Sequence, residues 1–138
     1  MFRTILLATD LTASSAIATD RAIELAARLQ ARLLIINVMD HRRLDGLGTH
    51  DRVDQARGER ENALLRIVRE ARTVGAQAEF IVWEGEPAPA LRAAVIAEQA
   101  DLLVVGSHGR DRAGRMLLGS VSDDMVRTAA CPVLIVRS

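Results

Sequence analysis

The sequence contains no lysine, so all 18 of its basic side chains are arginines. Lysine is the usual point-charge partner of a phosphate group and the residue that forms Schiff bases with carbonyl substrates. Its absence excludes Schiff-base chemistry. A phosphate group would have to be held by backbone amides, hydroxyl groups or arginine.

A net charge of one sign is also missing, because 18 acidic residues balance the arginines. Non-specific nucleic-acid binding normally draws on a net positive field. We therefore expect no nucleic-acid partner.

Long apolar runs are absent as well. No stretch approaches the roughly 18 apolar residues that span a bilayer, and the apolar start, residues 1–7, is too short for a signal peptide. The lone Cys131 cannot form an internal disulfide. We expect a cytoplasmic protein without a membrane partner.

Aromatic residues make up only 2% of the chain, against 49% hydrophobic residues in all, so the core must be aliphatic. A chain of 138 residues is the size of one ordinary domain. We expect a single domain over residues 1–138.

Five short apolar segments alternate with four helical patterns. The apolar segments are nearly continuous, which is typical of strands buried on both faces, and they span residues 3–9, 33–38, 78–83, 101–105 and 133–136. The helical patterns cover residues 17–29, 61–71, 87–99 and 119–130, with Thr12 and Ser14 as candidate N-caps of the first. Residues 40–58 lack either pattern and predict a long loop. This alternation predicts an α/β fold with an open parallel sheet and helices on both faces.

The loop after the fourth predicted strand carries the clearest functional signal. It begins Gly106-Ser107-His108-Gly109 and ends Gly119-Ser120-Val121-Ser122. Gly106 and Gly109 can adopt positive φ and allow the backbone to approach a ligand closely, so that successive amides converge on an anion. Gly119-Ser120 opens a helix, whose N-terminus also attracts anions. Together these features favour a polyphosphate.

Two common phosphate-binding motifs do not fit. Gly114 and Gly119 have the spacing of a Walker loop, but Ser120 stands where that motif requires lysine. The first predicted strand ends in Thr9-Asp10-Leu11-Thr12 without a glycine, which disfavours a dinucleotide-binding dehydrogenase. His41 and His50 stand among several aspartates, but their spacing fits no short-range metal-ligand pair, which favours a solvated loop.

The glycine spacing resembles the ATP-binding branch of the universal stress protein family. The resemblance extends to the opening strand that ends in Ala8-Thr9-Asp10, the strand that ends in Asn37-Val38, and the closing segment Cys131–Val136. It implies a five-stranded parallel sheet in the order 3-2-1-4-5. That order places the switch point between the first and fourth strands, where ligands bind in open α/β sheets.

The resemblance also implies roles for individual residues. Ala8, Thr9 and Asp10 would line the adenosine side, with Asp10 near the nucleotide or its Mg²⁺, and Val38 would contact adenine. The ribose and phosphates would be wrapped by Gly106, Ser107, His108 and Gly109, with Arg110 as an auxiliary positive charge. Gly119, Ser120, Val121 and Ser122 would close over the phosphates. ATP, ADP or AMP is the expected ligand.

The segment Val133–Val136 would form an edge strand, and unpaired apolar edges invite pairing with another chain. Related proteins resemble homodimers joined through this segment, so we expect a homodimer that serves as a stress-response or signalling module. Two alternatives stay open. The chain could be an interaction protein with an empty, degenerate cleft, or a slow ATPase in which Asp10 or His108 assists hydrolysis.

Overall fold

The computed structural model describes residues 1–40, 50–107 and 119–137, in which five strands form one parallel sheet. The strands are β1 (Thr4–Ala8), β2 (Arg32–Met39), β3 (Gln77–Glu84), β4 (Leu102–Gly106) and β5 (Val133–Val136). Their order across the sheet is β3-β2-β1-β4-β5, and all four pairings are parallel. The predicted strand order and the α/β class are confirmed.

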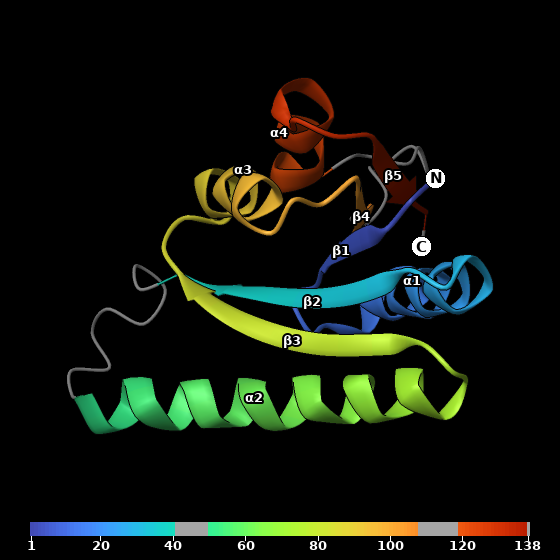
Figure 1. Cartoon of the computed structure of the whole chain (residues 1–138). Helices are drawn as coiled ribbons and strands as arrows, with labels where there is room; N and C mark the ends of the chain where they lie inside the picture. The colour runs from blue at the N-terminus through green and yellow to red at the C-terminus, as the bar shows by residue number, and fades with distance from the viewer. Residues whose placement is uncertain (41–49, 108–118, 138) are drawn as a thin grey trace, which may run out of the picture.

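Helices cover both faces of this sheet (Figure 1). They are α1 (Ala16–Leu29), α2 (His50–Thr73), α3 (Pro87–Ala97) and α4 (Ser120–Thr128), and a short 3-10 helix, Ala13–Ser15, precedes α1. The helices α1 and α2 pack on one face, and α3 and α4 on the other. Each strand therefore needs apolar residues on both sides, which explains the continuous apolar runs.

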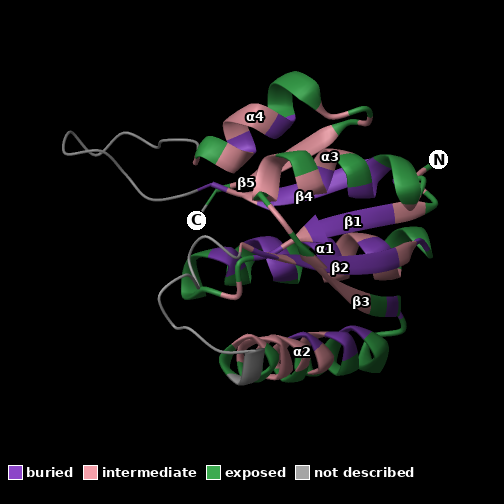
Figure 2. Ribbon diagram, turned by 90° about the vertical axis from the view of Figure 1, so that its left-hand side faces the viewer, coloured by how far each residue is buried: buried purple, intermediate pink, exposed green. Residues whose placement is uncertain are grey.

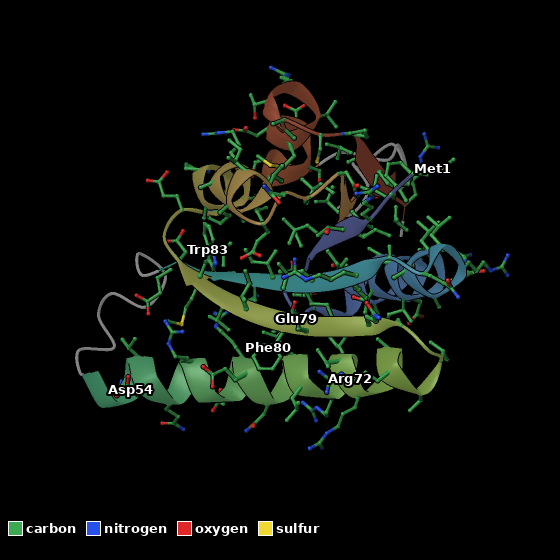
Figure 3. All side chains as sticks on the ribbon, in the orientation of Figure 1. Met1, Asp54, Arg72, Glu79, Phe80 and Trp83 are labelled. Carbon is green, nitrogen blue, oxygen red and sulfur yellow. The ribbon has the colours of Figure 1, made fainter. Side chains whose placement is uncertain are left out.

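The core consists of two aliphatic layers, one on each side of the sheet, with the strands buried between them (Figure 2). Alternate residues of β2 serve the two layers, Leu33 and Ile35 facing α1 and α2, and Leu34 and Ile36 facing α3 and α4. The few aromatic side chains lie at the margin. Phe80 packs on the α2 side of β3 and Trp83 on the α3 side (Figure 3).

The prediction of a loop over residues 40–58 was wrong for residues 50–58, because α2 begins at His50. The first turns of α2 are highly polar, and only a few side chains there, such as Val53 and Ala56, are half-buried. An apolar stripe therefore appears only from Leu64 onward. Gly58 lies inside the helix, although glycine is more typical of loops. Residues 41–49 lie outside the described part of the chain.

The predicted N-caps of the first helix were also wrong. Thr12 precedes the 3-10 helix, Ser14 lies within it, and the residue that precedes α1 is Ser15. None of the helices in the described ranges is both long and apolar enough to cross a membrane.

Candidate functional site

A cavity of about 370 Å³ opens at the carboxyl ends of β1, β2 and β4. The strand order reverses here, because β1 is flanked by β2 on one side and β4 on the other. The walls come from the loop after β1, the end of β2, α2, the start of α3, the end of β4 and the start of α4. The lining residues are Ala8, Thr9, Asp10, Thr12, Ser14, Ser15, Ile36, Asn37, Val38, Asp40, Arg60, Pro87, Leu91, Val105, Gly106, Ser107, Ser120, Val121 and Ser122.

The loop after β1 is held by its own hydroxyl groups. The Asp10 carboxylate accepts hydrogen bonds from the backbone N–H of Thr12 (3.0 Å) and from its hydroxyl group (2.6 Å). Thr9 Oγ1 lies 3.0 Å from Ser15 Oγ and accepts the backbone N–H of Leu11, whose φ of 64° is left-handed. Asp10 therefore organises the turn while its side chain still faces the cavity.

On the other side of the cavity, α4 is tied to the end of β4. The buried Ser122 hydroxyl group donates a 2.8 Å hydrogen bond to the carbonyl oxygen of Gly106. Gly119 precedes α4 in an extended conformation, so the N-terminus of this helix lies at the cavity together with the exposed Ser120. Its unpaired N–H groups favour a negatively charged ligand.

Gly106 does not adopt the positive φ that the sequence analysis considered for it. Among the described glycines only Gly75 and Gly85 have positive φ, so Gly106 does not use the left-handed region. A Cβ atom at Gly106 would meet Ala18 Cβ at 3.6 Å and the Ser14 carbonyl oxygen at 3.8 Å, which are ordinary contacts. The end of β4 thus packs against the start of α1, with room for an alanine at this position.

The β2 side of the cavity contains residues that the sequence analysis missed. Asn37, only 2% exposed, donates its Nδ2 to the Thr9 carbonyl oxygen at 2.8 Å. Its Oδ1 accepts a 2.8 Å hydrogen bond from Nη1 of Arg60, which extends from α2. A polar residue within the otherwise apolar run of β2 is the signal that could have singled out Asn37. Arg60 had no such signal, because its helical segment was interpreted partly as a loop.

The charged residues that line the cavity in the described ranges are Asp10, Asp40 and Arg60. Two carboxylates and one guanidinium group thus line the cavity, together with the hydroxyl-bearing residues Thr12, Ser14 and Ser120. No cluster of three or more potential metal ligands occurs among the described residues. The expected metal role of Asp10 would therefore require oxygen atoms supplied by a ligand.

The structure brings most of the predicted site residues together. Ala8, Thr9, Asp10, Val38, Gly106, Ser107, Ser120, Val121 and Ser122 line the same cavity. Gly119 directly precedes the α4 residues of this set. The predicted residues His108, Gly109 and Arg110 lie outside the described residues.

A parallel sheet with helices on both faces and an open cavity where the strand order reverses defines a Rossmann-like α/β protein. The chain belongs to the universal stress protein family, whose pattern it matches over residues 1–137.

Individual relatives agree with this assignment. Universal stress protein YxiE of Bacillus subtilis is 36% identical over 148 residues, and the alignment spans 99% of this chain and 100% of the relative. A universal stress protein solved in complex with cAMP is 32% identical, with a TM-score of 0.76 over 99% of this chain and 97% of that chain. The protein MJ0577 shares the fold with a TM-score of 0.86 at 24% identity, over 100% of this chain and 97% of that chain.

Proposed function

We propose that this universal stress protein binds an adenine nucleotide, ATP in the first place, in the cavity at the carboxyl ends of β1, β2 and β4. The observation that carries the proposal is the convergence on one cavity of a helix N-terminus, an apolar wall and the hydroxyl groups of Thr12, Ser14 and Ser120. The solved relative that is 32% identical holds cAMP, which is also an adenine nucleotide. The bound and empty forms would act as the two states of a stress-response or signalling module in the cytoplasm.

The polar and apolar walls of the cavity suit different parts of a nucleotide. Ser120 and the start of α4 stand at the β4 side, where the backbone N–H groups of the helix and the Ser120 hydroxyl group would hold phosphate oxygens. Ile36, Val38 and Leu91 form an apolar wall on the β2 and α3 side, which suits the face of a base. Asp10 would hold the ribose or a Mg²⁺ ion carried in by the phosphates.

Rapid hydrolysis does not follow from this arrangement. Among the described lining residues the carboxylates of Asp10 and Asp40 are the groups able to accept a proton from water, and Asp10 is already engaged by Thr12. Efficient phosphoryl transfer also relies on positive charges around the transferred group. We therefore propose a binding protein with at most slow ATP hydrolysis.

We further propose that two copies associate through β5. Within the described residues this strand pairs with β4 alone, so its other edge presents N–H and C=O groups that have no strand partner there. Its four residues are all half-buried, which leaves apolar surface for a second copy.

Mass spectrometry of small molecules released from the purified, denatured protein tests the nucleotide assignment directly. We expect an adenine nucleotide, and its phosphate content will report whether ATP has been cleaved. Isothermal titration with ATP, ADP, AMP and cAMP should then give saturable binding. Absence of binding to all four at millimolar concentration would instead support the interaction protein with an empty cleft.

Hydrolysis is tested separately by phosphate release from ATP with the wild-type protein and with Asp10→Ala. Release that disappears in the variant while ATP still binds would establish the slow ATPase. Turnover equal to that of buffer would establish a pure binding protein.

A further inference from the structure

Arg60 places a positive charge at the candidate site. It belongs neither to the glycine motif nor to the loop after β1. It extends from α2, on the face of the sheet opposite to α3 and α4, and its side chain lines the cavity. It makes no ion pair with any residue in the described ranges, whereas Arg57, one turn earlier, pairs with Glu84. A guanidinium group has five N–H donors, and the interaction with Asn37 engages Nη1 alone.

Asn37 fixes the position of this guanidinium group. The Asn37 amide is buried and is oriented by its own hydrogen bond to the Thr9 carbonyl oxygen, so its Oδ1 presents a fixed acceptor to Arg60. The chain of contacts runs from α2 through β2 to the end of β1. The remaining N–H groups of Arg60 are thereby held at the cavity before any ligand arrives.

The position of Arg60 across the sheet indicates which part of a ligand it meets. The phosphate-binding features stand at β4 and α4, and β4 is separated from β2 by β1. Neighbouring strands lie about 4.8 Å apart, so Arg60 approaches the cavity about 10 Å from the strand that holds the phosphates. The residues that flank Asn37 on β2, Ile36 and Val38, also line the cavity, and their apolar side chains belong to the layer on the α3 side of the sheet.

We propose that Arg60 is a specificity-determining residue that donates a hydrogen bond to a ring nitrogen of the purine base rather than to the phosphates. The proposal rests on the proposed nucleotide-binding function and adds a residue outside the glycine motif to it. The adenine ring exposes the acceptors N1, N3 and N7, and a guanidinium held by Asn37 can donate to one of them without disturbing its contact with the protein.

A ligand series separates base recognition from phosphate recognition. Isothermal titration with adenosine, AMP, ADP and ATP should be carried out on the wild-type protein, Arg60→Met and Arg60→Lys. We expect Arg60→Met to weaken all four ligands by the same factor, about tenfold, the size of one hydrogen bond from a charged donor. Arg60→Lys retains a donor and should recover part of this loss. A loss that grows from adenosine to ATP, or no loss for any ligand, would overturn the proposal.

Arg57→Met is the matched control. It removes an arginine of the same helix that pairs with Glu84 and does not line the cavity. Its affinities should equal those of the wild type for all four ligands, and an equal loss in both variants would assign the effect to α2 as a whole. If the wild-type protein binds none of the four ligands, the proposed function fails, whereas wild-type binding that Arg60→Met leaves unchanged contradicts this inference alone.

Arg60→Met also removes the hydrogen-bond donor of Asn37 Oδ1, so a loss of affinity in this variant could be indirect. Adenosine analogues that lack one ring nitrogen test whether Arg60 contacts the base directly. We expect that one of 1-deaza-, 3-deaza- and 7-deazaadenosine binds the wild type about tenfold more weakly than adenosine does, yet binds Arg60→Met as well as adenosine does. Equal losses in both proteins for every analogue would show that Arg60 only supports Asn37.

Discussion

At the scale of single residues, the site depends on a few short side chains that either hold the protein together or face the cavity. Ser122 and Ser120 stand two positions apart at the start of α4 and divide these tasks. The Ser122 hydroxyl group is buried and hydrogen-bonded to the Gly106 carbonyl oxygen, whereas Ser120 is exposed and its hydroxyl group makes no hydrogen bond within the described part of the chain. Substitution of each by alanine should therefore have different consequences.

We expect Ser122→Ala to lower the free energy of unfolding by about 1 kcal/mol, because the Gly106 carbonyl group loses a buried donor. Ser120→Ala should change it by less than about 0.5 kcal/mol but weaken ATP binding severalfold. Urea denaturation and isothermal titration of the two variants check this. Equal stability losses in both would contradict the division of tasks.

Gly106 makes a second prediction at this scale. Gly106→Ala should change the free energy of unfolding by less than about 1 kcal/mol, because its Cβ would meet Ala18 and Ser14 at ordinary contact distances. Gly106→Leu overfills the same space against the start of α1 and should cost about 1–3 kcal/mol. Urea denaturation of both variants is the measurement. An alanine variant as unstable as the leucine variant would show that β4 and α1 lie closer together.

At the scale of elements, α2 is the helix whose start could not be predicted. Its first turns are polar because they lie where few apolar side chains of the sheet are available for contact, and only its second half carries buried residues such as Leu64 and Val68. The position of Gly58 inside the helix gives a direct test of its extent.

Gly58→Ala should stabilise the protein by about 0.5–1 kcal/mol, since alanine favours a helix interior and no atom lies within 4 Å of the added Cβ. Gly75→Ala is the control. Gly75 has a φ of 88°, which strains alanine, so this variant should lose stability. Thermal denaturation of the two variants is the measurement, and destabilisation by Gly58→Ala would place this residue outside a regular helix.

The starts of β1 and β4 are joined by Asp101. Its carboxylate accepts the backbone N–H groups of Arg3 (2.8 Å) and Thr4 (3.0 Å). Burial raises the pKa of this carboxyl group, but the hydrogen bonds from the backbone N–H groups of Arg3, Thr4 and Asp101 itself, together with the positive N-terminus, outweigh burial and lower its pKa. The folded state therefore favours the charged form, and the stabilisation is fully present above the unfolded-state pKa of about 3.9.

We expect Asp101→Asn to cost about 1 kcal/mol at pH 7, with the difference from the wild type shrinking as the pH falls below about 4. Urea denaturation at several pH values between 7 and about 3 is the measurement. Glu24→Gln, which affects exposed ion pairs on α1, should cost less than about 0.5 kcal/mol. A cost of Asp101→Asn that stays constant with pH would contradict the role of the charge.

At the scale of the whole molecule, the free edge of β5 is the feature that bears on assembly. Leu103 N–H bonds to the Pro132 carbonyl oxygen and Ser107 N–H to that of Val136. Because the N–H and C=O of one residue in a parallel strand point to the same side, Ile135 directs its backbone groups away from β4. No other strand of the described part of the chain pairs with these groups, and we expect them to pair with a second copy.

Ile135→Pro removes an outward N–H group at an edge position, where proline is tolerated. We expect this variant to be monomeric under conditions in which the wild type is a dimer. Ile135→Ala removes comparable packing but keeps the N–H group, so it should remain a dimer. Size-exclusion chromatography with light scattering checks both. A dimeric proline variant would exclude pairing through this edge.

Much of the fold and part of the site were determined by the sequence alone. Continuous apolar runs such as Leu33–Val38 specify strands buried on both faces, and their alternation with helical patterns specifies a parallel sheet. The spacing from Gly106 to Gly119-Ser120, through its resemblance to a known family, identified one wall of the cavity. These features are local or repeat at short intervals along the chain, so they can be recognised in the sequence alone.

Only the tertiary structure decided that Arg60 reaches the same cavity as Asp10 and Ser122. Arg60 is 23 residues from Asn37 in sequence, and the two meet because α2 crosses back over the sheet and is held against β2 and β3. The packing of Gly106 against the start of α1 was likewise invisible, since it depends on the distance between two elements. Contacts between distant segments depend on how the layers pack, and no pattern within a single segment records that.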